Sequence, residues 1–489
     1  MTRTRPSRQP WDLLVIGGGT AGIVAAKTAA QLGASVLLVE SHRTGGDCLW
    51  TGCVPSKALL AAADVAAVAR SGQAKGVEVS EVKVDFSAVM GHVHEAIGTI
   101  APVDSAEALI EAGVEVLHGR ARFTGPGRAQ VGETELTFRQ AVIATGAAPA
   151  VPGITGLDSA PHLTSDTVWE LETLPSRLVV LGGGSIGCEL GQAFTRLGSH
   201  VTVVEGAPRL LPREDHDAAS VVHEVMTGEG TEVLTGVSVT GAEAHTDPKD
   251  PYVTGCLRLD DGRLLPYSHL LVAVGRAPRT RDLGLETVGV EVGDRGFLKV
   301  DSMLRTTNKR IWAAGDLTGH PQFTHTAGGH GSLAASNAVL GVRRKVDLSA
   351  VPRVTYTHPE VAAVGVTTDD PPDGLRVLTW RHTHVDRAVT EGETGGFTKL
   401  TVDGRGRILG ATVVGPRAGE TLGELTVAVT QGLRTRDLAG VTHAYPTWND
   451  GPWNAAVADV REQLQRPGTR RALATLARTR RWWVTHRAG

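Results

Sequence analysis

The sequence is poor in aromatic residues and in cysteines, and neither sign of charge is in strong excess. Phe, Trp and Tyr make up 4% of the 489 residues, whereas glycine occurs 60 times. This balance disfavours an aromatic-rich β-sandwich and favours a fold with many tight strand-to-helix turns. The net charge of -3 gives no signal for nucleic-acid binding. A chain of this length can bury more than one hydrophobic core.

A long hydrophobic run is also missing near the start of the chain. The first apolar stretch, residues 13–16, breaks into three consecutive glycines, so it is too short for a signal peptide or a membrane span. We therefore expect a cytoplasmic protein. Without a secretion signal, a close pair of cysteines indicates redox or metal chemistry rather than a structural disulfide.

Residues 12–40 read DLLVIGGGTAGIVAAKTAAQLGASVLLVE, the pattern of a dinucleotide-binding βαβ unit. Gly17 permits the tight turn, Gly19 lets the backbone approach a pyrophosphate, and Gly22 lets the helix pack closely on the strand. Glu40 ends the second strand, where a carboxylate binds a ribose hydroxyl. The strand, the helix and the terminal acid therefore all occupy the positions that dinucleotide binding requires.

The same pattern recurs at residues 178–205, LVVLGGGSIGCELGQAFTRLGSHVTVVE. Gly182, Gly184 and Gly187 form the turn, and Glu205 ends the second strand. The sequence therefore predicts two dinucleotide sites. A carboxylate at this position accepts the 2′-hydroxyl of NAD and repels the 2′-phosphate of NADP, so NADH is favoured. Arg209 keeps NADPH open as the alternative.

Three further segments run from an apolar strand into a glycine turn: AVIATGAAP (141–149), LVAVGRAP (271–278) and IWAAGDLTG (311–319). We expect Thr145, Gly146 and Gly275 to lie at these strand ends, near a cofactor. Asp316 occupies a position from which a carboxylate could hold a sugar-like hydroxyl chain. An ordinary helix cap is the alternative interpretation of Asp316.

The segment GGDCLWTGCVPSK (45–57) places four residues between Cys48 and Cys53. About one helical turn can bring the two sulfurs within bonding reach. No second pair at zinc-finger spacing accompanies them, so we predict no metal site. Coincidental free thiols remain the alternative. Cys188 and Cys256 are expected to be inert core thiols.

In these stretches the chain resembles the flavin disulfide reductases, the class that includes dihydrolipoamide dehydrogenase, glutathione reductase and mercuric reductase. The resemblance covers roughly residues 11–460 and departs from the family stretch GGTCLNxGCxPSK at Asp47 and Trp50. It extends to VTYTHPEVAAVGVT (354–367), GGFTKL (395–400) and ILGATVVGPRAGE (408–420). It implies that the first glycine motif holds FAD and the second the nicotinamide cofactor, with Thr145, Gly146 and Asp316 in contact with the flavin.

The resemblance also implies a route for electrons. NADH would reduce the flavin, which would open a disulfide between Cys48 and Cys53. Cys53 would be the thiolate on the flavin side and Cys48 the outward sulfur that exchanges with substrate. Lys57 and Glu189 match a family ion pair that lies beside the flavin. This ion pair would tune hydride transfer.

The chain departs from the family near its C-terminus, where HPTxSE is replaced by YPTWND (445–450). Tyr445 occupies the position of the acid–base histidine, and Asp450 that of the glutamate. A phenol with a pKa of about 10 cannot readily accept the proton that dithiol exchange releases. This weakens a lipoamide or glutathione assignment. His443 is an alternative base, although alternate residues of an extended segment face opposite ways.

Mercuric reductases share the tyrosine, but the expected N-terminal CxxC domain and a vicinal cysteine pair at the tail are missing from this sequence. We therefore expect a small-molecule or metal-ion electron acceptor, either a disulfide or a soft metal. The alternatives are a diaphorase-like quinone reductase, a dihydrolipoyl dehydrogenase, and a non-enzymatic redox module.

The predicted fold is α/β, with two Rossmann-like dinucleotide-binding domains and a C-terminal α+β dimerisation domain. The expected ranges are an FAD-binding domain at 1–150, an NAD(P)-binding domain at 151–275, the second part of the FAD-binding or central domain at 276–345, and the interface domain at 346–460. Because the family's acid–base residues act across the subunit boundary, we expect a homodimer.

The last 29 residues, 461–489, form a basic tail with eight arginines against one acid, Glu462, and with Trp482 and Trp483 near the end. As a helix, the tail resembles a basic interfacial segment that could touch an anionic membrane. A solvated, arginine-rich helix is the plainer alternative.

Overall fold

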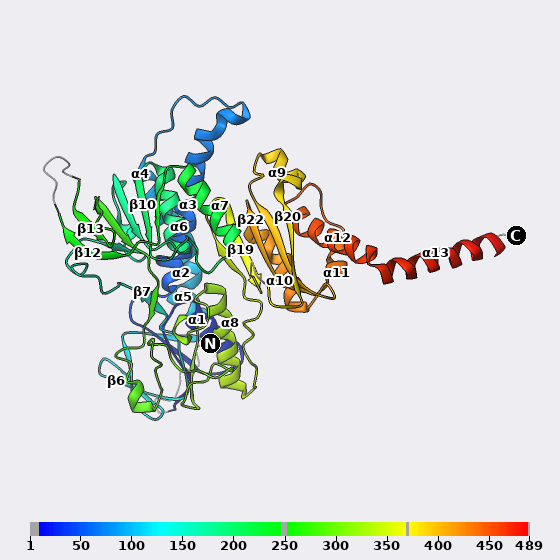
Figure 1. Cartoon of the computed structure of the whole chain (residues 1–489). Coiled ribbons are helices and arrows are strands. Elements are labelled where there is room, and N and C mark those ends of the chain that lie inside the picture. Colours follow the sequence, from blue (N-terminus) through cyan, green and yellow to red (C-terminus); the bar gives the residue numbers. More distant parts are fainter. Residues whose placement is uncertain (1–8, 246–251, 368–370, 488–489) are drawn as a thin grey trace. The chain divides into compact units, whose positions relative to one another are not determined.

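The computed structural model describes residues 9–245, 252–367 and 371–487 (Figure 1). The chain divides into two compact units, Met1–Leu211 with Met226–Asp347, and Pro212–Val225 with Leu348–Gly489. Both dinucleotide folds lie in the first unit, and the C-terminal α+β fold makes up most of the second. The predicted α/β class is confirmed.

The first sheet of the first unit has the order β3-β2-β1-β6-β5-β4, with β17 paired to β6. The C-terminal half of β6 pairs in parallel with β1 and β17, while its N-terminal half pairs antiparallel with β5. Apolar runs such as LLVI and VLLV are buried because helices cover a parallel sheet on its faces. The strands are β1 (Trp11–Ile16), β2 (Val36–Glu40), β3 (Val114–His118), β4 (Ala121–Gly125), β5 (Arg128–Val131), β6 (Thr134–Ile143) and β17 (Ile311–Ala313).

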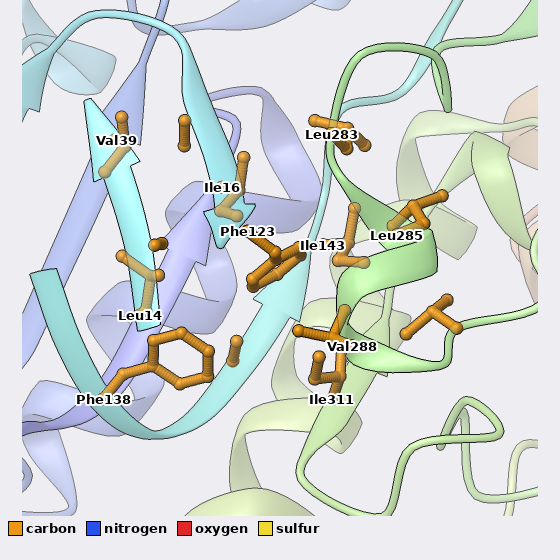
Figure 2. Close-up of a cluster of buried hydrophobic side chains, with 14 of the residues drawn as sticks. Leu14, Ile16, Val39, Phe123, Phe138, Ile143, Leu283, Leu285, Val288 and Ile311 are labelled. Atoms are coloured by element: carbon orange, nitrogen blue, oxygen red, sulfur yellow. The ribbon is translucent and has the colours of Figure 1, made fainter. Parts of the chain in front are cut away.

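A buried hydrophobic cluster fills one face of this sheet (Figure 2). Phe123 and Phe138 pack edge to face, with ring centroids 5.7 Å apart. Leu285 and Val288 approach from the segment before β17, and the cluster joins residues that are more than 250 positions apart in sequence. This packing joins residues 283–317 to the N-terminal part of the same sheet in one hydrophobic core.

Helices α1 (Thr20–Gln31) and α8 (Thr324–Leu340) pack against each other, so closely that a Cβ at Gly331 would overlap the carbonyl oxygen of Ala21. The remaining helices of this part are α2 (Gly46–Trp50), α3 (Cys53–Ser71), α4 (Phe86–Ile100) and α5 (Ala106–Glu111). The stretch Gly46–Lys75 is long and apolar enough to span a membrane. Within this stretch α3 packs on α4 and on α6 (Ser185–Leu197), and 33% of the most apolar window is buried.

The second dinucleotide fold has a parallel sheet with the order β11-β10-β9-β15-β8 and one main helix, α6 (Ser185–Leu197). Two smaller sheets, β12-β13-β14 and β16-β7, accompany it. The strands are β7 (Ala147–Pro149), β8 (Leu163–Thr164), β9 (Arg177–Leu181), β10 (His200–Glu205), β11 (Glu232–Thr235), β12 (Val239–Ala244), β13 (Gly255–Leu259), β14 (Leu264–Tyr267), β15 (His269–Val272) and β16 (Arg276–Pro278).

The second unit is built on an antiparallel sheet with the order β18-β19-β22-β21-β20. Residues 212–225 belong to it because Lys399 binds Asp215 at 2.8 Å and Arg353 binds Glu214 at 2.8 Å. Its strands are β18 (Arg353–Thr355), β19 (Glu360–Gly365), β20 (Leu375–Arg381), β21 (Phe397–Asp403) and β22 (Ile408–Gly415). Its helices are α9 (Asp386–Glu391), α10 (Ala418–Gln431), α11 (Thr435–Ala439), α12 (Asp450–Gln465) and α13 (Pro467–Arg487), and α7 (His216–Gly228) starts in it.

Candidate active site

The first glycine turn joins β1 to α1 and has the geometry of a pyrophosphate-binding turn. Gly17 adopts a φ of +107°, and a Cβ at Gly22 would overlap the carbonyl oxygen of Gly17. Gly19 caps α1 without a side-chain hydrogen bond, which leaves the first N–H groups of the helix available to an anion.

Glu40 lies beside this turn, where its carboxylate accepts hydrogen bonds from the Gly18 N–H (2.6 Å) and the His42 N–H (2.8 Å). A cavity of about 640 Å³ opens next to it. The polar and aromatic residues of its wall include Glu40, His42, Arg43, Thr44, Trp50 and His118. A cavity of this size suits a nucleoside, and Glu40 is placed to receive a ribose hydroxyl.

Trp50, which departs from the family stretch, is part of the same wall. Its indole N–H donates to the Thr44 carbonyl at 2.7 Å, and the Arg43 guanidinium lies 3.8 Å from its ring centroid. The cation–π contact holds the indole ring in the wall of the cavity.

The second glycine turn repeats the first in detail. Gly182 has a φ of +112°, and a Cβ at Gly187 would overlap the carbonyl oxygen of Gly182. Gly184 caps α6 without a side-chain hydrogen bond. Glu205 accepts hydrogen bonds from the N–H groups of Gly183 (2.6 Å) and Ala207 (2.7 Å).

Cys48 lies in α2, and Cys53 is the first residue of α3. No disulfide joins the two sulfurs in the structure. Cys53 is exposed and its Sγ lies 3.2 Å from the Thr324 hydroxyl, whereas Cys48 is half-buried. Cys188 and Cys256 are buried, as expected of core thiols.

The two thiols differ strongly in acidity. A hydrogen bond from Cys48 is the main cause that lowers the pKa of Cys53 to about 6, and Thr324 and Lys57 lower it further. The same hydrogen bond, together with burial, raises the pKa of Cys48 well above the ordinary thiol value. At neutral pH the reduced pair therefore carries one thiolate, on Cys53.

In the reduced protein, alkylation of Cys53 should rise with pH through a pKa of about 6, instead of the ordinary thiol value of 9.0. Peptide mapping after brief iodoacetamide treatment at a series of pH values measures this. Replacing Lys57 with methionine should raise that pKa because a cation beside the thiolate is lost. The exposed Lys309 is a matched control whose replacement should change nothing. A Cys53 profile with its midpoint near 9 would contradict the assignment.

Lys57 and Glu189 form the ion pair that the resemblance implies. Lys57 Nζ lies 2.8 Å from Glu189 Oε2, and the glutamate side chain is buried on α6. Lys57 is one turn along α3 from Cys53, so the pair joins the thiol helix to the helix of the second glycine turn. Its effect on hydride transfer stays a prediction.

Thr145 and Gly146 follow β6 and are held by the segment after β16. The Thr145 hydroxyl donates to the Arg279 carbonyl at 2.6 Å, and the Arg279 N–H donates to the Gly146 carbonyl at 2.9 Å. Gly275 has a φ of +138°, and its carbonyl accepts from the Ala150 N–H. These bonds bring the predicted strand-end positions together.

Asp316 lies in the same region, where burial raises the pKa of its carboxyl and Arg276 and Arg279 oppose that effect. Arg276 Nε is 3.6 Å from Asp316 Oδ2, and the Arg276 guanidinium also contacts Asp47. Arg279 lies within 3.8 Å of Asp47. The arginines thus connect the residue before Cys48 with the expected flavin-binding carboxylate.

Tyr445 and Asp450 lie in the second unit. The Tyr445 hydroxyl donates to Asp386 Oδ2 at 2.5 Å. Asp450 is buried in the first turn of α12, accepts from the Thr447 N–H, and has a pKa raised by burial. His443 bonds Glu424 at 2.7 Å through Nε2 and the Val441 carbonyl through Nδ1, so neither ring nitrogen is left for substrate.

Sequence reasoning missed Thr324, Arg276 and Asp386. Arg276 directly follows Gly275, and Thr324 begins the helix after the glycine-rich turn of Asp316. Both residues could have been found in the sequence because each lies next to a recognised motif. Asp386 is 59 residues from Tyr445, and no local pattern connects them.

The residues present fit FAD. The anion-ready N-terminus of α1, Glu40 and the 640 Å³ cavity suit the adenosine diphosphate half. Asp316, Thr145 and Gly146 would hold the flavin half, near Cys53 and Lys57. The Nε atom of Arg276 is buried without a hydrogen-bond partner among the described residues, which suits a polar ligand at this position.

Two family models match the chain. The pyridine nucleotide-disulphide oxidoreductase model matches residues 11–331, and the dimerisation domain of the same family matches residues 351–456. The chain is 38% identical to a mercuric reductase of Streptomyces lividans over 447 residues, which covers 89% of this chain and 94% of that protein. It is 34% identical to a dihydrolipoyl dehydrogenase of Geobacillus stearothermophilus, covering 91% and 95% of the two chains.

Solved structures of flavoproteins are similar to this chain as well. LpdA of Mycobacterium tuberculosis has a TM-score of 0.82 at 28% identity and covers 91% of this chain and 99% of its own. A Cu(II) complex of RclA, an HOCl-induced flavoprotein disulfide reductase of Escherichia coli, has a TM-score of 0.82 at 26% identity, with 92% and 100% covered. Family members are FAD-dependent enzymes that use NAD(P)H, and the dimerisation domain supports a homodimer. The chain belongs to the pyridine nucleotide-disulphide oxidoreductase family.

Proposed function

We propose that this enzyme uses NADH to reduce a soft metal ion that binds at Cys48 and Cys53. The observation that carries the proposal is the side chain at position 445. The family's disulfide-exchanging members have a histidine base there, whereas here a phenol donates its proton to Asp386. The relatives named mercuric reductase, at 33 to 38% identity, support the same acceptor class.

The thiols suit this chemistry. Thiolate is the ligand that soft metal ions prefer, and Cys53 supplies one at neutral pH because its pKa is about 6. Binding of a divalent metal ion would displace the remaining thiol proton of Cys48. Bound FAD supplies a hydride equivalent taken from NADH. Two electrons reduce the divalent ion to the element, and the balance is one NADH oxidised to NAD⁺ with release of one proton.

Glu205 supports NADH as the donor. Two backbone N–H groups hold its carboxylate at the end of β10, and a fixed negative charge there opposes a 2′-phosphate. The ratio of kcat/KM for NADH to that for NADPH measures this preference.

Lipoamide and glutathione disulfide should be reduced at least about a hundredfold more slowly than a soft metal ion, because a positioned acid–base group contributes about that much or more to exchange. Replacing Tyr445 with histidine should raise disulfide turnover and leave metal turnover unimproved. Tyr445→Phe, which removes the hydroxyl without adding a base, is the matched control. NADH oxidation with each acceptor measures the rates, and fast lipoamide reduction by the unaltered enzyme would favour a dihydrolipoyl dehydrogenase instead.

A further inference from the structure

We propose that α13 docks on an anionic membrane surface and so tethers the enzyme to a bilayer. This inference is independent of the electron acceptor. The helix lies beyond residues 351–456, which the dimerisation-domain model matches, and it continues the chain after α12 (Figure 1). No described side chain of α13 is buried. The helix thus lies outside the matched dimerisation domain, and within this chain it buries none of its described side chains.

The charge on α13 has one sign. Residues 467–487 contain six arginines and no aspartate or glutamate. The arginines are Arg470, Arg471, Arg478, Arg480, Arg481 and Arg487. A helix of 21 residues is about 32 Å long, so six charges distributed along and around it give a dense positive surface that complements a layer of anionic headgroups.

An apolar stripe runs along the same helix. Leu473, Leu476, Trp483 and Val484 are spaced so that they share one side of the helix, and each is 40 to 65% exposed. Arg480 and Arg487 lie on this side as well, over the Trp483 ring. The Arg480 guanidinium lies 4.6 Å from the Trp483 ring centroid. Tryptophan beside arginine is an arrangement suited to the interface between headgroups and acyl chains.

The positive charge and the apolar side of α13 together indicate which kind of surface the helix binds. A helix without buried side chains is marginal in water, so its exposed stripe calls for an apolar surface. A second copy of α13 would bring six arginines against six more, and repulsion opposes that contact. A nucleic acid would satisfy the arginines but leave Leu473, Leu476 and Val484 in water. An anionic bilayer satisfies the charges and the stripe at once.

Vesicle sedimentation of the full-length holoenzyme tests the proposal. One set of vesicles contains phosphatidylcholine mixed with phosphatidylserine, and the other contains phosphatidylcholine alone. The protein should sediment with the first set, less as salt is raised, and a variant lacking residues 466–489 should stay in the supernatant. Flavin content and NADH-driven quinone reduction check that each variant is folded.

Two variants separate the charge from the stripe. Replacing Arg470, Arg471 and Arg478 with glutamine should weaken vesicle binding about a hundredfold, since each arginine near the surface contributes about fivefold. The control replaces the exposed Arg120, Arg128 and Arg343 of the first unit with glutamine and should bind as the parent does. Leu476→Ala with Trp483→Ala should weaken binding at least about tenfold.

Several results would overturn the proposal. Equal binding to both vesicle types, or no loss on tail deletion, would remove the role of α13. Binding to duplex DNA or RNA that depends on the arginines but not on Leu476 and Trp483 would make the partner a nucleic acid. Weakened vesicle binding in the control variant would show that any loss of positive charge has the same effect.

Discussion

Replacing Cys48 with serine should lower NADH-driven reduction of a soft metal ion by on the order of a thousandfold or more, because residues that act as a unit lose most of their effect when one is removed. A hydroxyl is a poor ligand for a soft metal and cannot form a disulfide with Cys53. Steady-state NADH oxidation with Hg(II) as acceptor measures the loss, and Cys53→Ser should show a loss of the same order.

Quinone reduction by the Cys48→Ser enzyme should survive, because a quinone can take electrons from the flavin without the thiols. Cys256→Ser is the matched control, since Cys256 is a buried thiol of β13, away from the pair in sequence and fold. If Cys48→Ser kept full metal turnover, the dithiol would not be the place where the metal is reduced. The enzyme would then be a diaphorase that works from the flavin alone.

Alanine at Gly22 and alanine at Gly187 should produce two different defects of large size. In both turns the new Cβ would overlap a backbone carbonyl oxygen, so the turn must shift. Overpacking of this kind costs about 1–3 kcal/mol and spoils the anion site. Gly22→Ala should purify with little flavin. Gly187→Ala should purify yellow but show a KM for NADH raised by on the order of a hundredfold.

Flavin absorbance per chain and the rate of flavin bleaching by NADH separate the two outcomes. Gly91→Ala in α4 is the control, because a Cβ there meets no atom within 4 Å. Loss of flavin from Gly187→Ala with retention by Gly22→Ala would reverse the assignment of the two folds.

Much of the first unit could be predicted because its signals are local. Each glycine turn lies between an apolar strand and a helix. In the structure Glu40 is the last residue of β2, and Glu205 is the last residue of β10. The ion pair of Lys57 and Glu189 was accessible only through the family resemblance, because 132 residues separate its members.

The parts that escaped prediction depend on contacts between distant segments. The expected NAD(P)-binding range, 151–275, stays a prediction; within it, residues 212–225 group with the second unit, where the buried Asp215 binds Lys399. Nothing in either local sequence announces that pair. The same holds for Asp386, which lies 59 residues from Tyr445 in sequence and accepts a hydrogen bond from its hydroxyl.

The most direct test of the account is the stoichiometry of metal reduction by the purified, FAD-loaded enzyme. The enzyme, with its thiols reduced and its flavin oxidised, receives one equivalent of Hg(II) without oxygen, then NADH, and both NAD⁺ and elemental mercury are measured. The account predicts one NAD⁺ for each mercury atom released, with none released by Cys48→Ser. NADH oxidation without mercury release, or equal release by the two enzymes, would contradict it.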